Sequence, residues 1–180
     1  MFSVIIATHD SERPLVHTLS ALVPGATTGL VREVIVADGQ STDETEQVAD
    51  YAGCMFLSSA EPLGGRLKAA AQRARGDWLM FLRAGAVPGP TWIDETIAFV
   101  QQTPPGAAVF SAEKRGFVSW IGRAFATLPG AEQGLVIPKP LYAQLGGHQG
   151  DVGDPEADLL RRIGRSGLKA LRTIVTHADI

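Results

Sequence analysis

Residues 33–45 read EVIVADGQSTDET, and this stretch decides the fold. Its first five residues are mostly β-branched and apolar, which predicts a short strand buried on both faces. The dipeptide Asp38-Gly39 follows, and it is typical of a turn. Thr42 or Asp43 is then expected to cap a helix that runs to about Tyr51, with glutamates in its first turn, where the helix dipole favours carboxylates. The stretch therefore predicts a strand, a polar turn and a helix in succession.

The same order of elements is expected on both sides of this stretch. Residues 2–8, FSVIIAT, predict another buried strand, followed by a helix that contains Pro14 and stops at Pro24-Gly25. Downstream, the pattern continues with strands at 54–58 and 77–83 and an Ala-rich helix at 65–75. This alternation predicts an α/β fold of Rossmann-like type, in which helices flank a mostly parallel sheet. Such sheets bind ligands beyond the carboxyl ends of their strands.

The second half of the chain has a weaker pattern. The segments expected to be regular are helices at 91–102, 140–145 and 158–164 and strands at 107–111 and 135–138. Between them, residues 116–128 carry apolar side chains at helical spacing, among them Trp120. This segment is either a packed helix or a helix in peripheral contact with a membrane. A chain of 180 residues predicts one domain, 1–180, with a short irregular part at 95–180.

Composition excludes several classes of protein. The 16 Lys and Arg residues against 19 Asp and Glu give a net charge of −3, without a basic cluster, which argues against a nucleic-acid partner. Cys54 is the single cysteine, and no Cys/His spacing fits zinc, so neither a disulfide nor a structural metal is expected. No signal peptide is recognised, and the expected location is the cytoplasm, at most peripheral to the inner membrane face. The dinucleotide-binding and P-loop glycine motifs do not occur.

Four segments in this order resemble glycosyltransferase family 2, in its small bacterial subgroup. They are SVIIATHDSE at 3–12, EVIVADGQSTDET at 33–45, GGRLKAAAQRARGDWLMFLRAGAVPGPTWID at 64–94 and EQGLVIPKPLYAQLGGH at 132–148. The resemblance implies a GT-A fold, with a nucleotide-binding half at 1–94 and an acceptor-side half at 95–180. It also implies transfer of a sugar, with inversion, from a UDP- or GDP-sugar to an acceptor that the sequence does not identify.

The resemblance assigns three residues to the nucleotide sugar. Thr8 and Asp38, at the ends of two strands, are expected at the nucleoside, where a carboxylate can accept from a base N–H or a ribose hydroxyl. Arg66, after Gly64-Gly65 at a helix start, is expected at the phosphates or the base. Each has a plainer interpretation: a strand end for Thr8, a turn for Asp38 and a solvated side chain for Arg66.

The chain departs from the family after the fourth strand. Relatives carry Asp-x-Asp, or His-Ala-Asp, and the last Asp holds Mg²⁺ or Mn²⁺ against the diphosphate. This chain reads Arg83-Ala84-Gly85, and Gly85 has no side chain to offer a metal. No metal or other cofactor is therefore expected in this place.

Three interpretations of Arg83 follow. Its guanidinium replaces the metal, since arginine binds phosphate oxygens bidentately. Alternatively, catalysis has been lost, and the domain is an inactive module that binds a nucleotide or a partner. In the third interpretation, Arg83 only extends into solvent.

Glu156 is the candidate general base. It takes the register of the family's catalytic Asp in Asp154-Pro155-Glu156-Ala157-Asp158, where Pro155 replaces the usual preceding Glu. The same residues also read as an ordinary helix start, with Asp154 as the N-cap and Pro155 as the first helical residue. By the same resemblance, Glu132 and Gln133 are candidates on the acceptor side.

Overall fold

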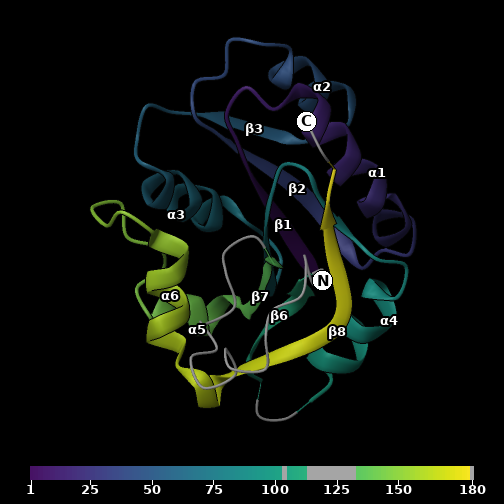
Figure 1. The fold of residues 1–180 in the computed structure, drawn as a ribbon, viewed down its shortest axis with the longest axis vertical. Coiled ribbons are helices and arrows are strands. Elements are labelled where there is room, and N and C mark those ends of the chain that lie inside the picture. The colour runs from purple at the N-terminus through teal and green to yellow at the C-terminus, as the bar shows by residue number, and fades with distance from the viewer. Residues whose placement is uncertain (103–104, 113–132, 179–180) are drawn as a thin grey trace, which may run out of the picture.

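A computed structural model of the chain describes residues 1–102, 105–112 and 133–178 (Figure 1). These residues form an α/β fold with one eight-stranded sheet, in the order β3-β2-β1-β4-β7-β6-β8-β5. The strands are β1 (Phe2–Thr8), β2 (Val31–Asp38), β3 (Met55–Ser58), β4 (Trp78–Arg83), β5 (Ala86–Pro88), β6 (Ala107–Ala112), β7 (Leu135–Pro138) and β8 (Leu168–His177). The helices are α1 (Glu12–Thr27), α2 (Thr45–Tyr51), α3 (Leu63–Arg73), α4 (Trp92–Val100), α5 (Lys139–Gln144), α6 (Pro155–Ile163) and the short 3-10 helix η3 (Arg165–Gly167).

The first four strands form the parallel part of the sheet that the sequence predicts. In register, Ile5 of β1 lies between Ile35 of β2 and Phe81 of β4, and β3 extends β2 in the same direction. The carboxyl ends of these strands therefore meet at one edge, where Thr8 is paired with Asp38. The predicted α/β fold with a mostly parallel, helix-flanked sheet is confirmed.

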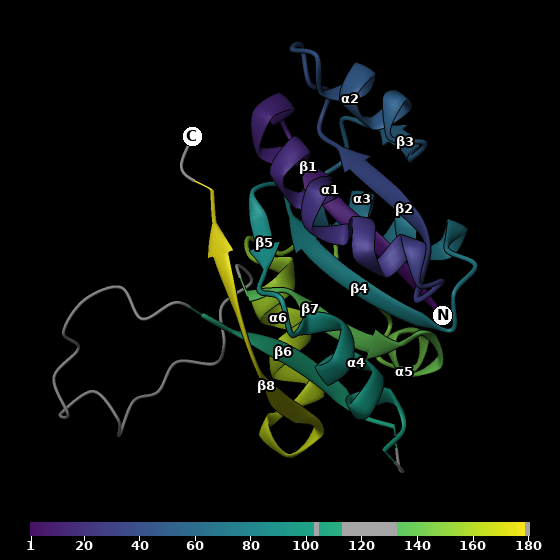
Figure 2. The same cartoon turned by 90° about the vertical axis from the view of Figure 1, so that its right-hand side faces the viewer.

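Antiparallel pairing begins at β4, which takes β7 as its next neighbour. The long strand β8 runs parallel to β6 and pairs with β5 in the opposite direction, as Figure 2 shows. Neither β5 nor β8 was predicted from the sequence. The signal for β8 was present, because buried Leu171, Thr173 and Val175 alternate with exposed residues, which is the period of a strand.

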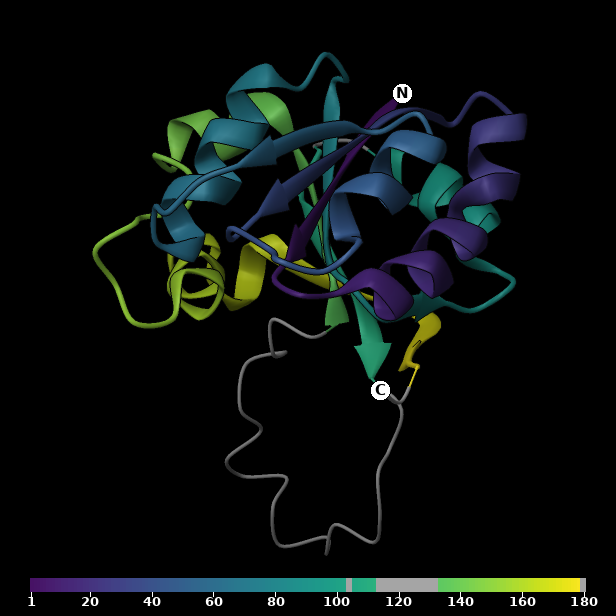
Figure 3. The same cartoon turned by 90° about the horizontal axis from the view of Figure 1, so that it is seen from above.

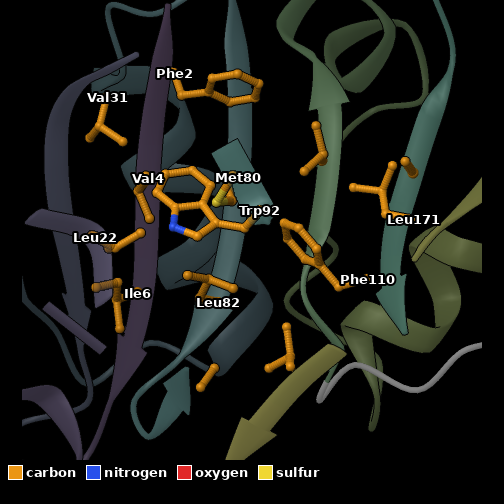
Figure 4. Close-up of a cluster of buried hydrophobic side chains, with 14 of the residues drawn as sticks. Phe2, Val4, Ile6, Leu22, Val31, Met80, Leu82, Trp92, Phe110 and Leu171 are labelled. Atoms are coloured by element: carbon orange, nitrogen blue, oxygen red, sulfur yellow. The ribbon is translucent and has the colours of Figure 1, made fainter. Parts of the chain in front are cut away.

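Two hydrophobic clusters cover the two faces of the sheet, and the helices lie in layers on either side (Figure 3). Val4 and Ile6 of β1 face the cluster that contains Trp92 of α4, which Figure 4 shows among their side chains. Ile5 faces the opposite cluster, with Leu67 of α3 and Leu159 of α6. Successive residues of a strand point to opposite faces, so every polar residue at a strand end is assigned to one of these two sides.

Two helix boundaries differ from the sequence expectation. The helix predicted to stop at Pro24-Gly25 continues to Thr27, with Pro24 in its last turn. Gly25 is needed there for packing, because a β-carbon at this position would clash with the ring of Trp92. The last helix begins at Pro155 rather than 158, since Asp154 caps it by accepting from the Ala157 N–H at 2.9 Å. The predicted segment 116–128, with Trp120, lies outside the described residues. None of the helices in the described ranges has the length and apolarity that a bilayer crossing needs.

The dipeptide Gly64-Gly65 at the start of α3 has a packing role. A β-carbon on Gly64 would lie 2.0 Å from the Gln149 carbonyl oxygen, whereas one on Gly65 would meet only the flexible side chain of Glu61, at 3.3 Å. The absence of a side chain at Gly64 therefore lets the loop before α6 lie directly on the first turn of α3.

Gly64→Ala should lower the free energy of unfolding by about 1–3 kcal/mol, because the clash is with backbone that cannot rotate away. Gly65→Ala is the matched control in the same helical turn, and we expect a change within about 0.5 kcal/mol. Urea denaturation of both variants measures the difference. Equal stability of the two proteins would contradict the packing described for Gly64.

Candidate functional site

The carboxylate of Asp38 lies buried at the end of β2 and is fully engaged. It accepts from the hydroxyls of Thr8 at 2.8 Å and Ser58 at 3.0 Å, and from both the N–H and the hydroxyl of Ser41. These donors occupy all of the roughly four lone-pair sites of a carboxylate. Burial alone would raise the pKa of Asp38, but the bonds from Ser41, Thr8 and Ser58 outweigh it and hold the pKa below its ordinary value.

The loops after β1 and β2 are joined by reciprocal hydrogen bonds. The Asp10 carboxylate accepts from the Thr42 N–H at 2.7 Å, and the Asp10 N–H donates to the Ser41 hydroxyl at 2.8 Å. Asp10 and Gln40, the second residue after each strand, both have positive φ, 45° and 62°. Non-glycine residues rarely adopt this conformation, so the bonds between the loops hold a strained backbone in place.

Arg66 of α3 lies over the same strand ends. Its guanidinium donates to the carbonyl oxygens of Thr8 at 3.0 Å and Ala37 at 2.9 Å. A β-carbon on Gly39 would come within 2.9 Å of this guanidinium, so Gly39 provides the space that Arg66 occupies. Burial lowers the pKa of Arg66 and the nearby Asp38 raises it, with a net lowering. The predicted residues Thr8, Asp38 and Arg66 are thus brought together.

Arg83 and Glu156 form the second group of predicted residues. The Arg83 side chain, 40% exposed, donates through Nε at 3.0 Å and through a terminal nitrogen to the same oxygen of Glu156, whose side chain is 10% exposed. Glu156 lies in the first turn of α6, beside the end of β4. Asp154 caps this helix as expected, yet the Glu156 carboxylate is directed at Arg83 rather than at solvent, so the plain helix-start interpretation does not account for it.

The Thr8 and Asp38 side chains lie on the opposite side of the sheet from Arg83, whereas Arg66 comes from α3, which covers the same face as α6. By alternation along their strands, Thr8 and Asp38 share the face of Ile6 and Val36, while Arg83 shares the face of Phe81, which α6 covers. The sequence did not reveal this separation, because it depends on strand register. The acceptor-side candidate Gln133 is half-buried just before β7, and Glu132 lies outside the described residues.

The end of β4 does not offer the ligands that Mg²⁺ or Mn²⁺ requires. Gly85 has no side chain, and Arg83 brings a cation to this strand end. In the parts of the chain that the structure describes, no three His, Cys, Asp or Glu side chains could hold a metal together. Gly85 also has φ +92°, and its N–H donates to the Thr18 hydroxyl at 2.9 Å, so an aspartate there would be strained.

A pocket of about 650 Å³ opens beyond the carboxyl ends of β1 and β4. It is lined by His9, Asp10, Ser11, Glu12, Arg13, Pro14, Asp43, Ala84, Gly85, His177 and Ala178. His177 belongs to β8, so no reading of the sequence that missed this strand could place it here. The pocket is large enough for a drug-sized ligand and lies where ligands of parallel sheets bind.

A buried histidine lines the same small cavity as Glu156. His148 is 1% exposed, packs edge-on against Phe81 at 4.7 Å between ring centroids, and makes two contacts with the Tyr142 hydroxyl. Its Nε2 has no hydrogen-bond partner in the described structure. Burial and the charge of Arg162 together lower the pKa of His148 to about 3, against a partial offset by Asp158.

Comparison with protein families gives a match to the model described as glycosyl transferase family 2, over residues 3–134. A search of curated proteins found no match.

Solved structures share the fold at low identity. Glucosyl-3-phosphoglycerate synthase from Mycobacterium tuberculosis, in complex with Mn²⁺, UDP and glucosyl-3-phosphoglycerate, aligns with a TM-score of 0.77 and 18% identity over 100% of this chain and 72% of that one. Mannosyltransferase PcManGT from Pyrobaculum calidifontis, in complex with GDP-Man and Mn²⁺, aligns with a TM-score of 0.74 and 19% identity over 96% of this chain and 56% of that one. S. aureus TarS 1–349 aligns with a TM-score of 0.75 and 16% identity over 99% of this chain and 58% of that one. At these identities the similarity shows the fold alone, which is that of GT-A glycosyltransferases.

Asp38→Asn should lower the free energy of unfolding by about 2 kcal/mol, because the amide nitrogen would face hydroxyl and N–H donors that then lose their acceptor. Asp50→Asn, at an exposed position of α2, is the control and should change stability by less than about 0.5 kcal/mol. Chemical denaturation at pH 7 measures both. A fully stable Asp38→Asn protein would show that the four bonds contribute nothing net.

Stability should depend on pH through His148. The unfolded chain takes up a proton near pH 6.5 and the folded chain only near 3, so stability is lost as the pH falls below 6.5, by about 1.4 kcal/mol per unit. His148→Phe, which retains a ring against Phe81, should remove this slope between pH 6.5 and 5. Urea titrations across this range compare the two proteins, and parallel curves would contradict the burial of a neutral imidazole.

Proposed function

The chain belongs to glycosyl transferase family 2, and from this we propose that it transfers a sugar from a UDP- or GDP-sugar to an acceptor hydroxyl, with inversion and without a metal at the usual position. The observation that carries the proposal is the Arg83–Glu156 pair at the end of β4. It brings together a cation for a phosphate leaving group and a carboxylate for the acceptor proton, the two groups that the reaction needs. The acceptor class is left open.

Arg83 supplies the positive charge. The departing nucleoside diphosphate gains negative charge as the glycosidic bond breaks, and a guanidinium can accept it through paired N–H donors. The side chain of Arg83 is 40% exposed, so phosphate oxygens can approach it from the open edge of the sheet. Arg66 of α3, which is bound to the ends of β1 and β2, is a further cation near the strand ends and is assigned to the nucleotide.

Glu156 takes the proton of the acceptor hydroxyl. In the structure its carboxylate is bound by Arg83, which would restrain it as a base. When a diphosphate binds Arg83, it competes with Glu156 for the guanidinium N–H donors, and the carboxylate oxygen becomes available to the acceptor hydroxyl. Donor binding would therefore precede activation of the base.

An inactive nucleotide-binding or partner-binding module is the alternative. Two observations favour it: Asp38 is saturated by the protein's own donors, and Arg66 is bound to backbone carbonyl oxygens. In this case the residues at the strand ends serve the fold, and Arg83 and Glu156 form a structural ion pair.

Nucleotide binding that does not depend on metal is the first test. UDP, GDP, UDP-Glc and GDP-Man are titrated calorimetrically into the protein in EDTA and in Mn²⁺. At least one should bind equally well in both, and Arg83→Gln should weaken it by about 10- to 100-fold, the loss of a charge-assisted contact. Nucleotide binding that requires Mn²⁺ would refute the proposal that no metal takes part at this site.

Variants of the Arg83–Glu156 ion pair distinguish a transferase from an inactive nucleotide-binding module. Arg83→Lys retains charge without the paired donors, and Arg161→Gln, an exposed arginine on α6, controls for a general loss of charge. Transfer or hydrolysis of any nucleotide sugar that disappears in Glu156→Gln supports the transferase. Tight nucleotide binding with no turnover of any donor supports the inactive module, and no nucleotide binding at all refutes both.

A further inference from the structure

The Tyr142 hydroxyl determines which nitrogen of His148 carries the proton. It accepts from the backbone N–H of His148 at 3.0 Å, and its distance to Nδ1 of the same residue is 2.9 Å. The single phenolic proton is satisfied if it is donated to Nδ1, which makes Nδ1 an acceptor. A neutral imidazole then carries its own proton on Nε2, as a donor. The low pKa of His148 agrees with a neutral ring.

The donor on Nε2 is buried beside a small cavity. His148 and Glu156 both line this cavity, together with Phe81, Gly134 and Leu160, and its volume is about 10 Å³. This is about the space that one water molecule needs, and such a water requires at least two polar partners. His148 and Glu156 supply the polar side chains of this lining, and Nε2 of His148 has no other hydrogen-bond partner in the described structure.

We propose that His148 is a positioning residue for Glu156: its Nε2–H donates to one buried water, which donates in turn to the Glu156 carboxylate on the side away from Arg83. This water then adds to the restraint that Arg83 places on the carboxylate. A carboxylate has about four lone-pair sites, so it can accept this bond in addition to those from Arg83.

The turn at Gly146-Gly147 brings His148 back against Tyr142. Both glycines have positive φ, 81° and 69°, and a β-carbon on Gly147 would lie 2.9 Å from the Tyr142 ring. The chain therefore reverses tightly after α5 and returns His148 under Tyr142. Asp158 and Arg162 of α6 also act on the pKa of the imidazole, and they are paired with each other at 2.7 Å.

The role of His148 rests on the proposed function only in its last step, where Glu156 acts as the base. Two-bond ¹H–¹⁵N spectra of the histidine rings test the first step without any substrate. We expect a protonated Nε2 and an unprotonated Nδ1 in His148, and a loss of this preference in Tyr142→Phe. A protonated Nδ1 in the wild-type protein would overturn the proposal.

A crystal structure at high resolution tests the second step. One ordered water should contact Nε2 of His148 and the Glu156 carboxylate, and it should be lost in His148→Phe while Glu156 changes its orientation. A dry cavity, or an unmoved Glu156 in the variant, would refute the link. Neither result depends on whether the protein transfers sugars.

Where a donor that reacts has been found, the pH profile tests the consequence for catalysis. Removing a donated bond raises the pKa of a carboxylate, so the acid limb of kcat/KM should move to higher pH in His148→Phe, with KM for the donor changed less than twofold. His17→Phe, at an exposed site on α1, should leave the profile unchanged. An identical profile in His148→Phe would overturn the positioning role, while absence of turnover in the wild-type protein would count against the proposed function alone.

Discussion

The buried carboxylate of Asp38 is the interaction on which the site depends. It binds donors from β1, β3 and the loop after β2, so three strand ends and one loop share a single anion. A charge removed from water is stable only when such donors surround it, and here they do. The same four bonds leave little capacity for a ligand. Asp38 is therefore better placed to shape the nucleotide end of the sheet than to contact the nucleoside directly.

Because successive strand residues point to opposite faces of the sheet, the residues that fix the loops and the Arg83–Glu156 pair lie on different faces. On one face, Asp38 and the joined loops fix the backbone at the ends of β1 and β2. On the other face, Arg83 meets Glu156, a residue 73 positions away, against the hydrophobic layer of Phe81 and α6. Rigid loops and a paired cation and anion at one edge of a sheet suit a ligand with a polar head and a charged tail. An activated sugar ester has both.

The fold could be predicted from the sequence because each early strand is a continuous apolar run and each is followed by turn residues. β8 could not be read in the same way, since polar Thr173 is on its buried side and apolar Ile174 on its exposed side, and its partners, β6 and β5, are distant in sequence. Arg83 and Glu156 were singled out individually by comparison with a family motif. Their pairing was not foreseen, because it depends on how α6 packs across β4 and not on any local pattern.

The charge of Arg83 at the end of β4 is compensated by the carboxylate of Glu156. An unpaired guanidinium at a half-covered strand end would lose hydration without compensation, and an unpaired glutamate in the first turn of α6, 8% exposed, would lose more. Each group supplies the counter-charge that the other needs, so neither can be changed alone without cost. A divalent ion between them would introduce a second positive charge beside the guanidinium. The pair itself is neutral, so a phosphate that binds Arg83 would compete with Glu156 for the guanidinium.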